Sequence, residues 1–338
     1  MTRGPIAVVD YDDRWAVAQT AFAARCWPGK ARRGDPAYLR WEYRAAAVGP
    51  VPGLLLAVAG DEVVGQLGMI PGEAQVGARR LPIQWVGTLM VDPQHRRRGI
   101  STAIFERALE RPVVTLGRDP SPSAAPMMAT VGFSRAGSSE LMVLPLSAGQ
   151  VVTTRYPGLA RVSRGVDALG APVLRRLHRR LRDAAADPIA QVCTWREVVD
   201  DVASAEAATS QPHVVHDEAF LRWRCGGLAP WVREVDAVRT PRGSFALLER
   251  RSAELAVLHW HAVDADEVAP LMGRVAYLAG AYGSAYVEAV AVDGGPAEAL
   301  AALGFRARRT PVDLWCHPAG AVGEQRFAVQ GYDTDQNL

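Results

Sequence analysis

The chain has little lysine and cysteine and no long apolar segment. Lys30 is the only lysine among 38 lysine and arginine residues, so positive charge rests on arginine, which binds phosphate through paired N–H donors. The four cysteines form no C-x-x-C pair, which argues against a zinc site or a disulfide framework and favours reduced, mostly buried thiols. No run approaches the roughly 20 apolar residues that span a bilayer. The N-terminus lacks the features of a signal peptide, so we expect a cytoplasmic protein that does not enter a membrane.

Charge and composition narrow the class of protein further. Lysine and arginine number 38 against 36 aspartate and glutamate residues, so no overall field attracts nucleic acid and we expect none as a partner. Hydrophobic residues make up 49% and charged residues 22%, the balance of a globular protein with a sizeable core. A length of 338 residues favours two domains over one.

The first half alternates strand and helix patterns. Apolar runs and two-residue alternation predict strands at residues 6–9, 54–58, 63–70, 81–91, 113–116 and 140–146. Spacing of apolar residues by three and four predicts helices at residues 13–26, 36–47, 99–111 and 124–130. Helices inserted between strands in this order indicate an α+β fold, with a mixed, mostly antiparallel sheet flanked by helices.

The second half repeats the order of the first. Residues 35–41 read DPAYLRW and residues 217–223 read DEAFLRW. Both halves also end a helix with Gly-Phe, at residues 132–133 and 304–305. Shared order over a whole domain indicates an internal duplication. Because the tryptophan motif occurs in both halves, we expect it to have a structural role, with tryptophan and leucine filling the core.

These patterns divide the chain into four parts. We predict a first domain at residues 1–147, a helical linker at 148–186, a second domain of the same kind at 187–318 and a tail at 319–338. Within the linker, residues 173–182 place leucines on one helix face and arginines around the rest. Such a helix can dock its leucines on a domain; contact with a membrane surface or an acidic partner is the alternative.

One segment combines a strand end, a basic loop and a helix start. Residues 86–102 read VGTLMVDPQHRRRGIST, so the predicted helix begins at Gly99. The first N–H groups of a helix have no partner within it, and the helix dipole adds partial positive charge there. A diphosphate fits such a site. Gly99 permits close approach, the hydroxyls of Ser101 and Thr102 add donors, and the preceding arginines add charge.

This segment resembles the acyl-CoA signature of the GNAT superfamily (GCN5-related N-acetyltransferases), R/Q-x-x-G-x-G/A, in which Ser101 replaces the last small residue. The later family pattern N-x-x-A-x-x-x-Y-x-x-x-G-F is similar to residues 121–133, although Ser121 and Met128 replace its asparagine and tyrosine. The resemblance implies a tandem GNAT fold whose first half binds acetyl-CoA or another acyl-CoA as co-substrate. The residues implied to bind it are Leu89, Met90, Val91, Arg96, Arg97, Arg98, Gly99, Ile100, Ser101, Thr102 and Ser121.

The resemblance also implies parts of the chemistry. A backbone N–H near Met90 would stabilise the oxyanion, whereas the tyrosine that usually protonates the leaving thiolate is replaced by Met128. In the second half, the strand at residues 254–261 runs into VDADE without a basic glycine loop. This half therefore resembles a degenerate GNAT domain that does not bind CoA.

Five side chains are candidates for the general base. Glu42 follows the tryptophan motif, but the second copy has Arg224 at the equivalent place, which favours an exposed helix glutamate over a base. His95 precedes the arginines and could titrate near neutral pH, or could only shape the loop. His259 and His261 share one strand face, and Glu288 lies on the next strand, so this trio could hold an amine or be ordinary core and surface groups. No metal-ligand cluster or Walker loop is present.

We therefore expect an N-acyltransferase, most simply an N-acetyltransferase that acts on a small-molecule amine such as an amino sugar, an amino acid or a secondary-metabolite intermediate. The amine would attack the thioester directly, so positioning would supply most of the catalysis. Two alternatives stay open: a non-catalytic acyl-CoA-binding protein, and a transferase that uses aminoacyl-tRNA. The sequence is compatible with a monomer or a homodimer.

Overall fold

The computed structural model describes residues 5–46, 51–149, 189–322 except 229, 231, 252, 293, 294, 309 and 310, and 327–330. It also describes isolated residues at 152, 165, 166, 170, 172, 179, 181 and 183. The basic helix predicted at residues 173–182 therefore lies outside the described part, apart from two single residues. In the described ranges, no helix is long and apolar enough to span a bilayer.

The first half contains six strands and four α-helices in the described part. Its strands are β1 (Ile6–Tyr11), β2 (Val51–Ala59), β3 (Glu62–Val76), β4 (Arg79–Val91), β5 (Val114–Arg118) and β6 (Ser134–Pro145). Its helices are α1 (Ala16–Cys26), α2 (Pro36–Glu42), α3 (Ile100–Leu109) and α4 (Ala124–Thr130), with the 3-10 turns η1 (Asp13–Trp15), η2 (Ala31–Gly34) and η3 (Pro93–His95). All predicted strands of this half are confirmed. The helix predicted at 36–47 is shorter, because Arg44 adopts a positive φ of 54° and ends it.

The second half repeats this order. Its strands are β7 (Gln191–Thr194), β8 (His213–Val214), β9 (Asp236–Arg239), β10 (Phe245–Arg250), β11 (Glu254–His261), β12 (Tyr286–Val292), β13 (Arg306–Ala307) and β14 (Val312–His317). Its helices are α8 (Val199–Ala208), α9 (Glu218–Cys225), α10 (Val268–Ala281) and α11 (Gly295–Ala302), with the 3-10 turns η5 (Trp195–Val198) and η6 (Ala265–Glu267).

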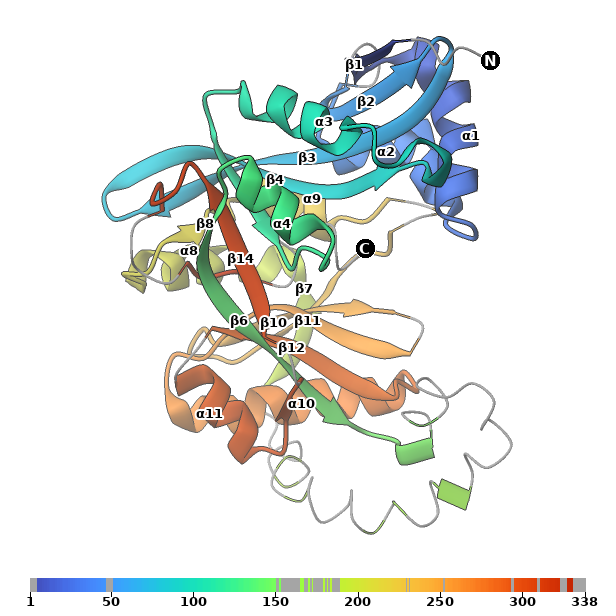
Figure 1. Ribbon diagram of the computed structural model, residues 1–338. Helices are drawn as coiled ribbons and strands as arrows, with labels where there is room; N and C mark the ends of the chain where they lie inside the picture. Colours follow the sequence, from blue (N-terminus) through green and yellow to red (C-terminus); the bar gives the residue numbers. More distant parts are fainter. Residues whose placement is uncertain are drawn as a thin grey trace.

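A single 14-stranded sheet joins the two halves (Figure 1). Its main path runs β1-β2-β3-β4-β5-β14-β6-β12-β11-β10-β9-β7, and only β4–β5 and β11–β12 are parallel neighbours. The mixed, mostly antiparallel sheet of the prediction is confirmed. The strand order adds a feature that the sequence did not reveal, since β14 lies between β5 and β6 although it belongs to the second half.

The two halves exchange their last strands. The first part of β6 pairs with β14 through Ser134–Ser139, and the second part pairs with β12 through Ser139–Pro145. On its other side β14 pairs with β5, where Leu314 lies opposite Arg118. Each half therefore completes its sheet with a strand from the other half, and neither predicted domain has a closed set of strands of its own.

Helices cover both faces of the sheet and create three apolar cores. Ile104 and Phe105 of α3 pack on one face of the first half, together with Met69 of β3. α10 and α11 cover the corresponding face of the second half. The largest core lies on the opposite face and unites α1, α2, η5, α8 and α9, for example through Phe22, Leu39 and Trp195. This shared core packs the two halves together.

The repeated motif forms equivalent helices at the centre of that core. Asp35 caps α2 by accepting a hydrogen bond from Tyr38 N (3.0 Å), and Asp217 caps α9 by accepting one from Phe220 N (2.8 Å). Both carboxylates satisfy an N–H group that the first helical turn leaves open. The structural role predicted for the motif follows from this geometry.

Candidate functional site

The central strand of the first half is irregular next to its end. Gln66 of β3 pairs with Met90, but Gly68 pairs with Gly87, so β4 carries one residue more than β3 between these points. Thr88 lies within this β-bulge and has a φ of +50°. A bulge of this kind redirects the following backbone groups away from the sheet ladder. Thr88 and Leu89 therefore lie outside the regular pairing with β3, directly before Met90, where the sequence predicts backbone contacts to a thioester.

Beyond the bulge, β4 and β5 separate. Their parallel pairing extends from Ile83 and Val114 to Val86 and Gly117, and no later pair follows among the described residues. The space between the diverging strands is a cleft of about 680 Å³. Its walls come from β4, β5, α3, α4 and the connection between α1 and α2. They comprise Trp27, Lys30, Arg33, Leu67, residues 86–91, Arg96, Ser101, Phe105, Gly117, Arg118, Pro120, Ser121, Ser123, Ala124, Met127 and Met128.

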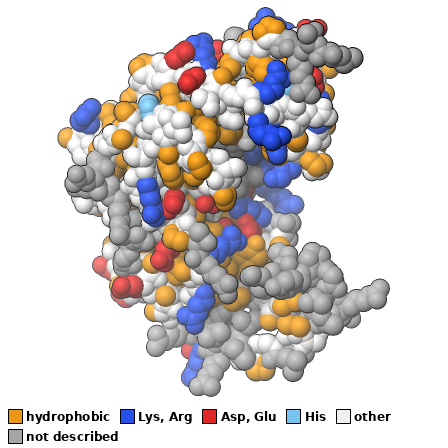
Figure 2. Space-filling view, viewed as in Figure 1, with side chains coloured by type: hydrophobic (Ala, Val, Ile, Leu, Met, Phe, Trp, Pro, Cys, Tyr) orange, Lys and Arg blue, Asp and Glu red, His pale blue; other side chains and the backbone are white. Residues whose placement is uncertain are grey.

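The residues that line this cleft come from both faces of the sheet. Phe105 and Met128 belong to the core beneath α3 and α4, whereas Trp27 packs with the shared core on the opposite face. Because residues of both cores line one cleft, a thioester that enters from the α3 side can meet a second substrate from the α1 side. Lysine and arginine side chains also gather on this side of the molecule, around a hollow between its upper and lower parts (Figure 2).

The helix α3 begins as predicted. Gly99 is its N-cap and adopts a left-handed conformation with φ +75° and ψ +6°. A Cβ placed on Gly99 would have no atom within 4 Å, so the backbone here faces open space. The N–H groups of Ile100, Ser101 and Thr102 belong to the first turn, where the helix itself supplies no acceptor. This arrangement can hold an anion of the size of a diphosphate.

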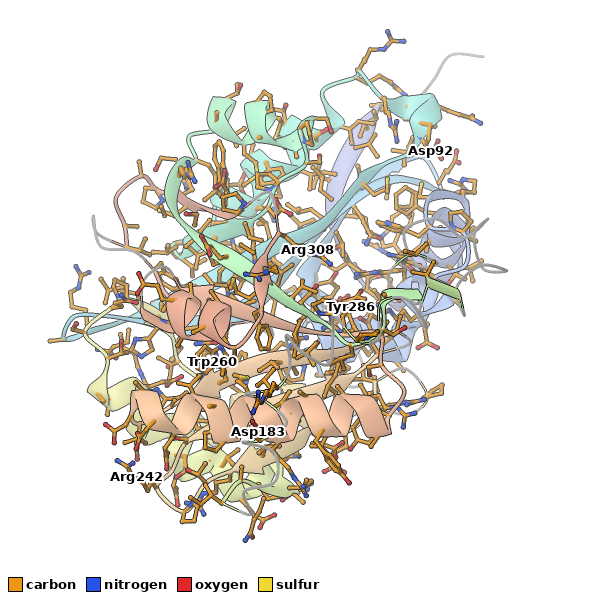
Figure 3. The ribbon with its side chains drawn as sticks, turned by 90° about the horizontal axis from the view of Figure 1, so that it is seen from below. Asp92, Asp183, Arg242, Trp260, Tyr286 and Arg308 are labelled. Atoms are coloured by element: carbon orange, nitrogen blue, oxygen red, sulfur yellow. The ribbon has the colours of Figure 1, made fainter. Side chains whose placement is uncertain are left out.

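Asp92 fixes the loop that leads to this helix. Its Oδ1 accepts a hydrogen bond from Gln94 N (3.0 Å), and its Oδ2 accepts one from Arg25 Nε of α1 (3.2 Å; Figure 3 labels Asp92). Burial alone would raise the pKa of this carboxyl, but the hydrogen bond from Gln94 and the Arg25 guanidinium hold its pKa below the usual value. The charged carboxylate therefore ties the end of β4 to α1.

The residues implied to bind acyl-CoA divide into two groups. Leu89, Met90, Val91, Arg96, Ser101 and Ser121 line the cleft. Arg97 and Gly99 are exposed at the loop surface, Thr102 and Arg98 are half-buried, and Ile100 is buried against Gly65 of β3. Arg98 Nη1 is buried and has no hydrogen-bond partner in the described part of the chain. Ile100 is therefore available through its backbone, whereas its side chain holds α3 to the sheet.

Met128 occupies the position expected for a proton-donating tyrosine. It is 3% exposed, and its Cε would lie 2.6 Å from a Cβ on Gly117. Its thioether reaches the last paired residues of β4 and β5 but has no proton to donate. The bulge itself carries a hydroxyl at Thr88, whose Oγ1 lies 3.0 Å from the hydroxyl of Tyr43. Sequence reasoning missed this hydroxyl pair, because Tyr43 reaches the bulge only through tertiary packing.

Glu42 does not lie on an exposed helix face, contrary to one of our interpretations. Its side chain is fully buried, and Arg33 Nη1 donates to its Oε1 and Oε2 at 2.9 and 3.1 Å. The hydroxyl of Tyr38 donates to Oε1 at 3.3 Å. Burial and the negative charge of Glu42 raise the pKa of Tyr38 far above its usual value. Glu42 is not among the cleft-lining residues; it influences the cleft through Arg33, which is.

His95 ends the 3-10 turn η3 and is half-buried. Its Nδ1 is buried without a hydrogen-bond partner in the described ranges, and the residue is not one of those that line the cleft. The structure thus places His95 beside the loop, at the position from which it can shape the turn.

The predicted trio of the second half is not one cluster. Glu288 pairs with Arg308 at 2.9 Å (Figure 3 labels Arg308), and burial followed by repulsion from Glu254 raises its pKa. His259 instead lies 5.2 Å from His216, measured between ring centroids. The histidines that line a second cleft, of about 450 Å³, are His213, His216, His259 and His261. Sequence reasoning missed His213, His216 and their neighbour Glu206, which hydrogen-bonds His216 Nδ1.

This second cleft is the counterpart of the first. The strands β11 and β12 are parallel and pair as far as Val257 and Ala289, after which they diverge. Here the gap is bridged, because Trp260 Nε1 of β11 donates to Val290 O of β12 at 3.0 Å (Trp260 is labelled in Figure 3). Its acidic lining residues are Glu206 and Asp264, and no lysine or arginine lines it in the described ranges. The two strands are therefore linked beyond their last pair, and the described lining offers no lysine or arginine to the phosphates of a nucleotide.

The first cleft contains residues that no sequence pattern singled out for a site. Trp27 and Arg33 come from the α1–α2 connection, Arg118 from the end of β5, and Phe105 from α3. Lys30 was conspicuous only as the single lysine. Arg118 could have been found from its place at the carboxyl end of β5, because parallel strands present their carboxyl ends to ligands.

Comparisons with known proteins agree with this architecture. Residues 16–112 match the sequence model of the acetyltransferase (GNAT) domain, a range that contains α1, the bulge and the start of α3. No curated protein matches the chain.

Solved structures extend the likeness over most of the chain. A GCN5-related N-acetyltransferase from Kribbella flavida is 16% identical, covers 92% of this chain over 70% of its own and has a TM-score of 0.61. One from Anabaena variabilis is 11% identical, with coverages of 92% and 72% and a TM-score of 0.59. A conserved protein from Enterococcus faecalis is 8% identical, with the same coverages and a TM-score of 0.58. At these identities the structures show a common fold.

Proposed function

Because residues 16–112 carry a GNAT acetyltransferase domain within a chain of GNAT fold, we propose that this protein is an acyl-CoA-dependent N-acyltransferase, most simply an N-acetyltransferase, acting on a small-molecule amine. Acyl transfer takes place in the cleft between β4 and β5 of the first half. The second half contributes structure by completing the sheet and the shared core, and binds no CoA.

One observation carries this proposal. The divergence of β4 from β5 after Val86, the bulge at Thr88 and the left-handed Gly99 at the start of α3 follow one another along the chain, and residues 86–91, Arg96 and Ser101 from this stretch line one cleft. A diphosphate at the first turn of α3 lies next to Arg96 and Ser101, both of which line the cleft. A pantetheine arm then extends along residues 87–91, whose backbone is freed from β5.

The residues of the cleft act mainly by positioning. The nitrogen of a neutral amine attacks the thioester carbonyl carbon, the N–C bond forms, and the C–S bond breaks as the sulfur leaves. A backbone N–H after the bulge, at Leu89 or Met90, faces the carbonyl oxygen and stabilises its developing charge. The proton lost by the amine and the proton gained by the thiolate balance each other. Met128 can neither take up the proton that the amine loses nor donate one to the thiolate. We therefore assign both proton transfers to solvent or to the Thr88 hydroxyl.

A thermal-shift titration with acetyl-CoA tests the cofactor site. Acetyl-CoA should raise the melting temperature of the wild-type chain, because a ligand that binds only the folded state stabilises it. Ser101→Asp places a carboxylate in the first turn of α3, where it favours the helix but repels a diphosphate. We expect this variant to melt no lower than wild type and to lose the acetyl-CoA shift, whereas Ser101→Ala keeps most of it.

Arg96→Glu supplies an independent check from the other side of the loop. It should weaken the acetyl-CoA shift at least as strongly as Ser101→Asp. If wild type shows no shift with any acyl-CoA, the proposal is wrong.

The burial of Met128 favours a second candidate function, acyl-CoA binding without turnover. It predicts the same thermal shift but no release of CoA thiol with any amine. A thiol-release assay with an amine panel separates the two functions. An RNA-dependent transferase is supported only by the arginines at residues 173–182, which lie outside the described residues apart from Arg179.

A further inference from the structure

The lining of the first cleft contains few side chains that can accept a hydrogen bond from an amine. Its charged side chains among the described residues are all cations: Lys30, Arg33, Arg96 and Arg118. Lysine and arginine side chains carry only donors. Apart from weakly accepting thioethers, the side-chain acceptors of the described lining are the hydroxyls of Thr88, Ser101, Ser121 and Ser123. An amine in this cleft therefore depends on a hydroxyl for a strong side-chain acceptor.

Three of these hydroxyls lie on the side proposed for acyl-CoA. Ser101 belongs to the first turn of α3, beside the proposed diphosphate position. Ser121 and Ser123 lie directly before α4, with their hydroxyl oxygens 3.0 Å apart. Because α3 and α4 pack on the same core, these serines face the co-substrate.

The Thr88 hydroxyl lies on the opposite face of the sheet. Its Oγ1 is 3.0 Å from the hydroxyl of Tyr43, and Tyr43 is buried in the shared core together with Phe22 and Leu39. Leu89, the next residue of β4, instead packs with the core beneath α3. The Thr88 side chain therefore projects toward α1 and α2, the side from which a second substrate can meet the thioester.

The backbone of Thr88 is unfavourable for a threonine. Its φ of +50° lies in the left-handed region, where a β-branched residue is an outlier and glycine is the ordinary choice. Strain of this kind is concentrated at functional sites. Gly68 of β3 leaves room for the pair, because a Cβ there would lie 2.6 Å from Thr88 Oγ1. The chain thus keeps a hydroxyl at a position that glycine would adopt more easily.

We propose that Thr88 is a catalytic residue whose Oγ1 accepts a hydrogen bond from an N–H of the attacking amine, and that Tyr43 is the positioning residue that fixes the Thr88 hydroxyl. This inference rests on the proposed acyl-CoA-dependent function. A hydroxyl oxygen has two lone pairs, so Oγ1 can accept this bond whichever hydroxyl donates within the pair. Because Leu89 directly follows Thr88, adjacent residues of the bulge hold the nucleophile and the oxyanion.

The hydrogen bond aims the amine without a proton passing through Thr88. It directs the lone pair of the neutral nitrogen at the thioester carbon. That lone pair forms the C–N bond, and the electron pair of the C–S bond leaves on the sulfur. The nitrogen then gives one proton to water and the sulfur takes one from water, while Thr88 keeps its own.

Matched variants of Thr88 test the hydroxyl. Glucosamine, the twenty standard amino acids and spermidine are assayed with acetyl-CoA by release of CoA thiol, and the fastest acceptor is used for kinetics. Thr88→Ser keeps the hydroxyl and should retain about half or more of the wild-type kcat/KM. Thr88→Ala should lose about tenfold, the effect of one hydrogen bond. Both variants should keep the acetyl-CoA thermal shift.

Thr88→Gly separates the hydroxyl from the fold. Glycine relieves the left-handed backbone, so this variant should melt no lower than wild type and yet lose as much activity as Thr88→Ala. Thr130→Ala is the matched control, because the exposed Thr130 Oγ1 donates to Pro126 O at 3.0 Å and Thr130 does not line the cleft. It should leave kcat/KM unchanged.

Tyr43→Phe tests the positioning role. It should lower kcat/KM, and the double variant Thr88→Ala/Tyr43→Phe should fall no further than Thr88→Ala alone, because Tyr43 acts through Thr88. Additive losses in the double variant would mean that Tyr43 acts by another route and would overturn the inference.

Three further results would overturn the inference and leave acyl-CoA binding standing. These are equal activity of Thr88→Ser and Thr88→Ala, loss of the acetyl-CoA shift in Thr88→Ala, and a melting temperature of Thr88→Gly far below that of wild type. An acetyl-CoA shift in wild type without thiol release from any amine also overturns it and favours binding without turnover. Absence of that shift in wild type removes both proposals.

Discussion

Trp41 and Trp223 donate reciprocal hydrogen bonds across the junction of the two halves. Trp41 Nε1 donates to Trp223 O at 3.2 Å, and Trp223 Nε1 donates to Trp41 O at 2.7 Å. Their ring centroids lie 5.9 Å apart. Because each tryptophan ends one copy of the repeated DPAYLRW/DEAFLRW pattern, these contacts bring the two copies of the pattern together.

Replacing either tryptophan by phenylalanine should weaken this junction. Each change removes one N–H donor and leaves a carbonyl of the other half without its partner, at a cost of about 1–2 kcal/mol in free energy of unfolding. Urea denaturation of Trp41→Phe, Trp223→Phe and the double variant measures the loss. Retention of the acetyl-CoA shift is expected, because neither tryptophan lines the first cleft. Unchanged stability in both single variants would contradict the structural role of the pair.

Glu42→Gln separates a structural carboxylate from a catalytic one. Arg33 pairs with Glu42, and the fully buried Arg224, whose pKa is lowered by burial, also interacts with Glu42 electrostatically. Removing the charge takes from the buried Arg33 guanidinium the carboxylate that it pairs with, and breaking a buried ion pair typically costs about 3–5 kcal/mol. We expect a large fall in melting temperature. A variant of normal stability with a much lower kcat would instead indicate that Glu42 acts as the base.

Gly68→Ala should disturb the bulge of β4. A Cβ on Gly68 would lie 2.2 Å from the Tyr43 hydroxyl and 2.6 Å from Thr88 Oγ1, so this hydroxyl pair must move. Crowding of this kind costs about 1–3 kcal/mol, and the displaced bulge should lower kcat. Gly72→Ala on the same strand is the control, since its Cβ would meet Ile83 at an ordinary 3.5 Å. Equal activity in the two variants would remove the bulge from the proposed mechanism.

Acid should destabilise the second half through His259. Burial, followed by the positive charges of His216, His261 and His213, lowers the pKa of His259 well below its model-compound value of 6.5. The unfolded chain then binds a proton that the native chain does not, so stability falls as pH drops below about 6.5 and continues to fall until the native pKa is reached. Melting temperatures between pH 7.5 and 5 should therefore decrease less in His259→Asn than in wild type. Parallel curves for the two proteins would assign the acid sensitivity to other groups.

Patterns among neighbouring residues predicted more of the site than similarities between distant parts of the chain did. The strand end, the loop and the helix start at Gly99 were predictable because strand period, turn chemistry and helix capping all depend on neighbouring residues. The helix at residues 124–130 has the predicted bounds. Ser121 was predicted for the cleft and lines it.

The sequence alone could not reveal which residues distant in the chain meet. Glu42 resembled a surface glutamate because its neighbours in the helix are mixed in polarity, yet Arg33 and Tyr38 bury it. Simple alternation along the strands would place Glu288 near His259 and His261. A register shift between Leu247 and Leu248, where β10 pairs with β11 beside His259, breaks this alternation. A register shift turns the following side chains toward the other face of the sheet, and the spacing of apolar residues in the sequence does not reveal where such a shift occurs.

The sequence by itself determined the GNAT-like order of elements, the repeated DPAYLRW/DEAFLRW pattern and the start of α3 at Gly99, because each depends on residues that are close together in the chain. Only the tertiary structure decided the exchange of β6 and β14 between the halves, the bridge of Trp260 across the second cleft, and the uniform positive charge of the first. These features depend on strand pairing and packing between residues far apart in the chain, where many arrangements share the same local pattern and differ only in the contacts that they bury.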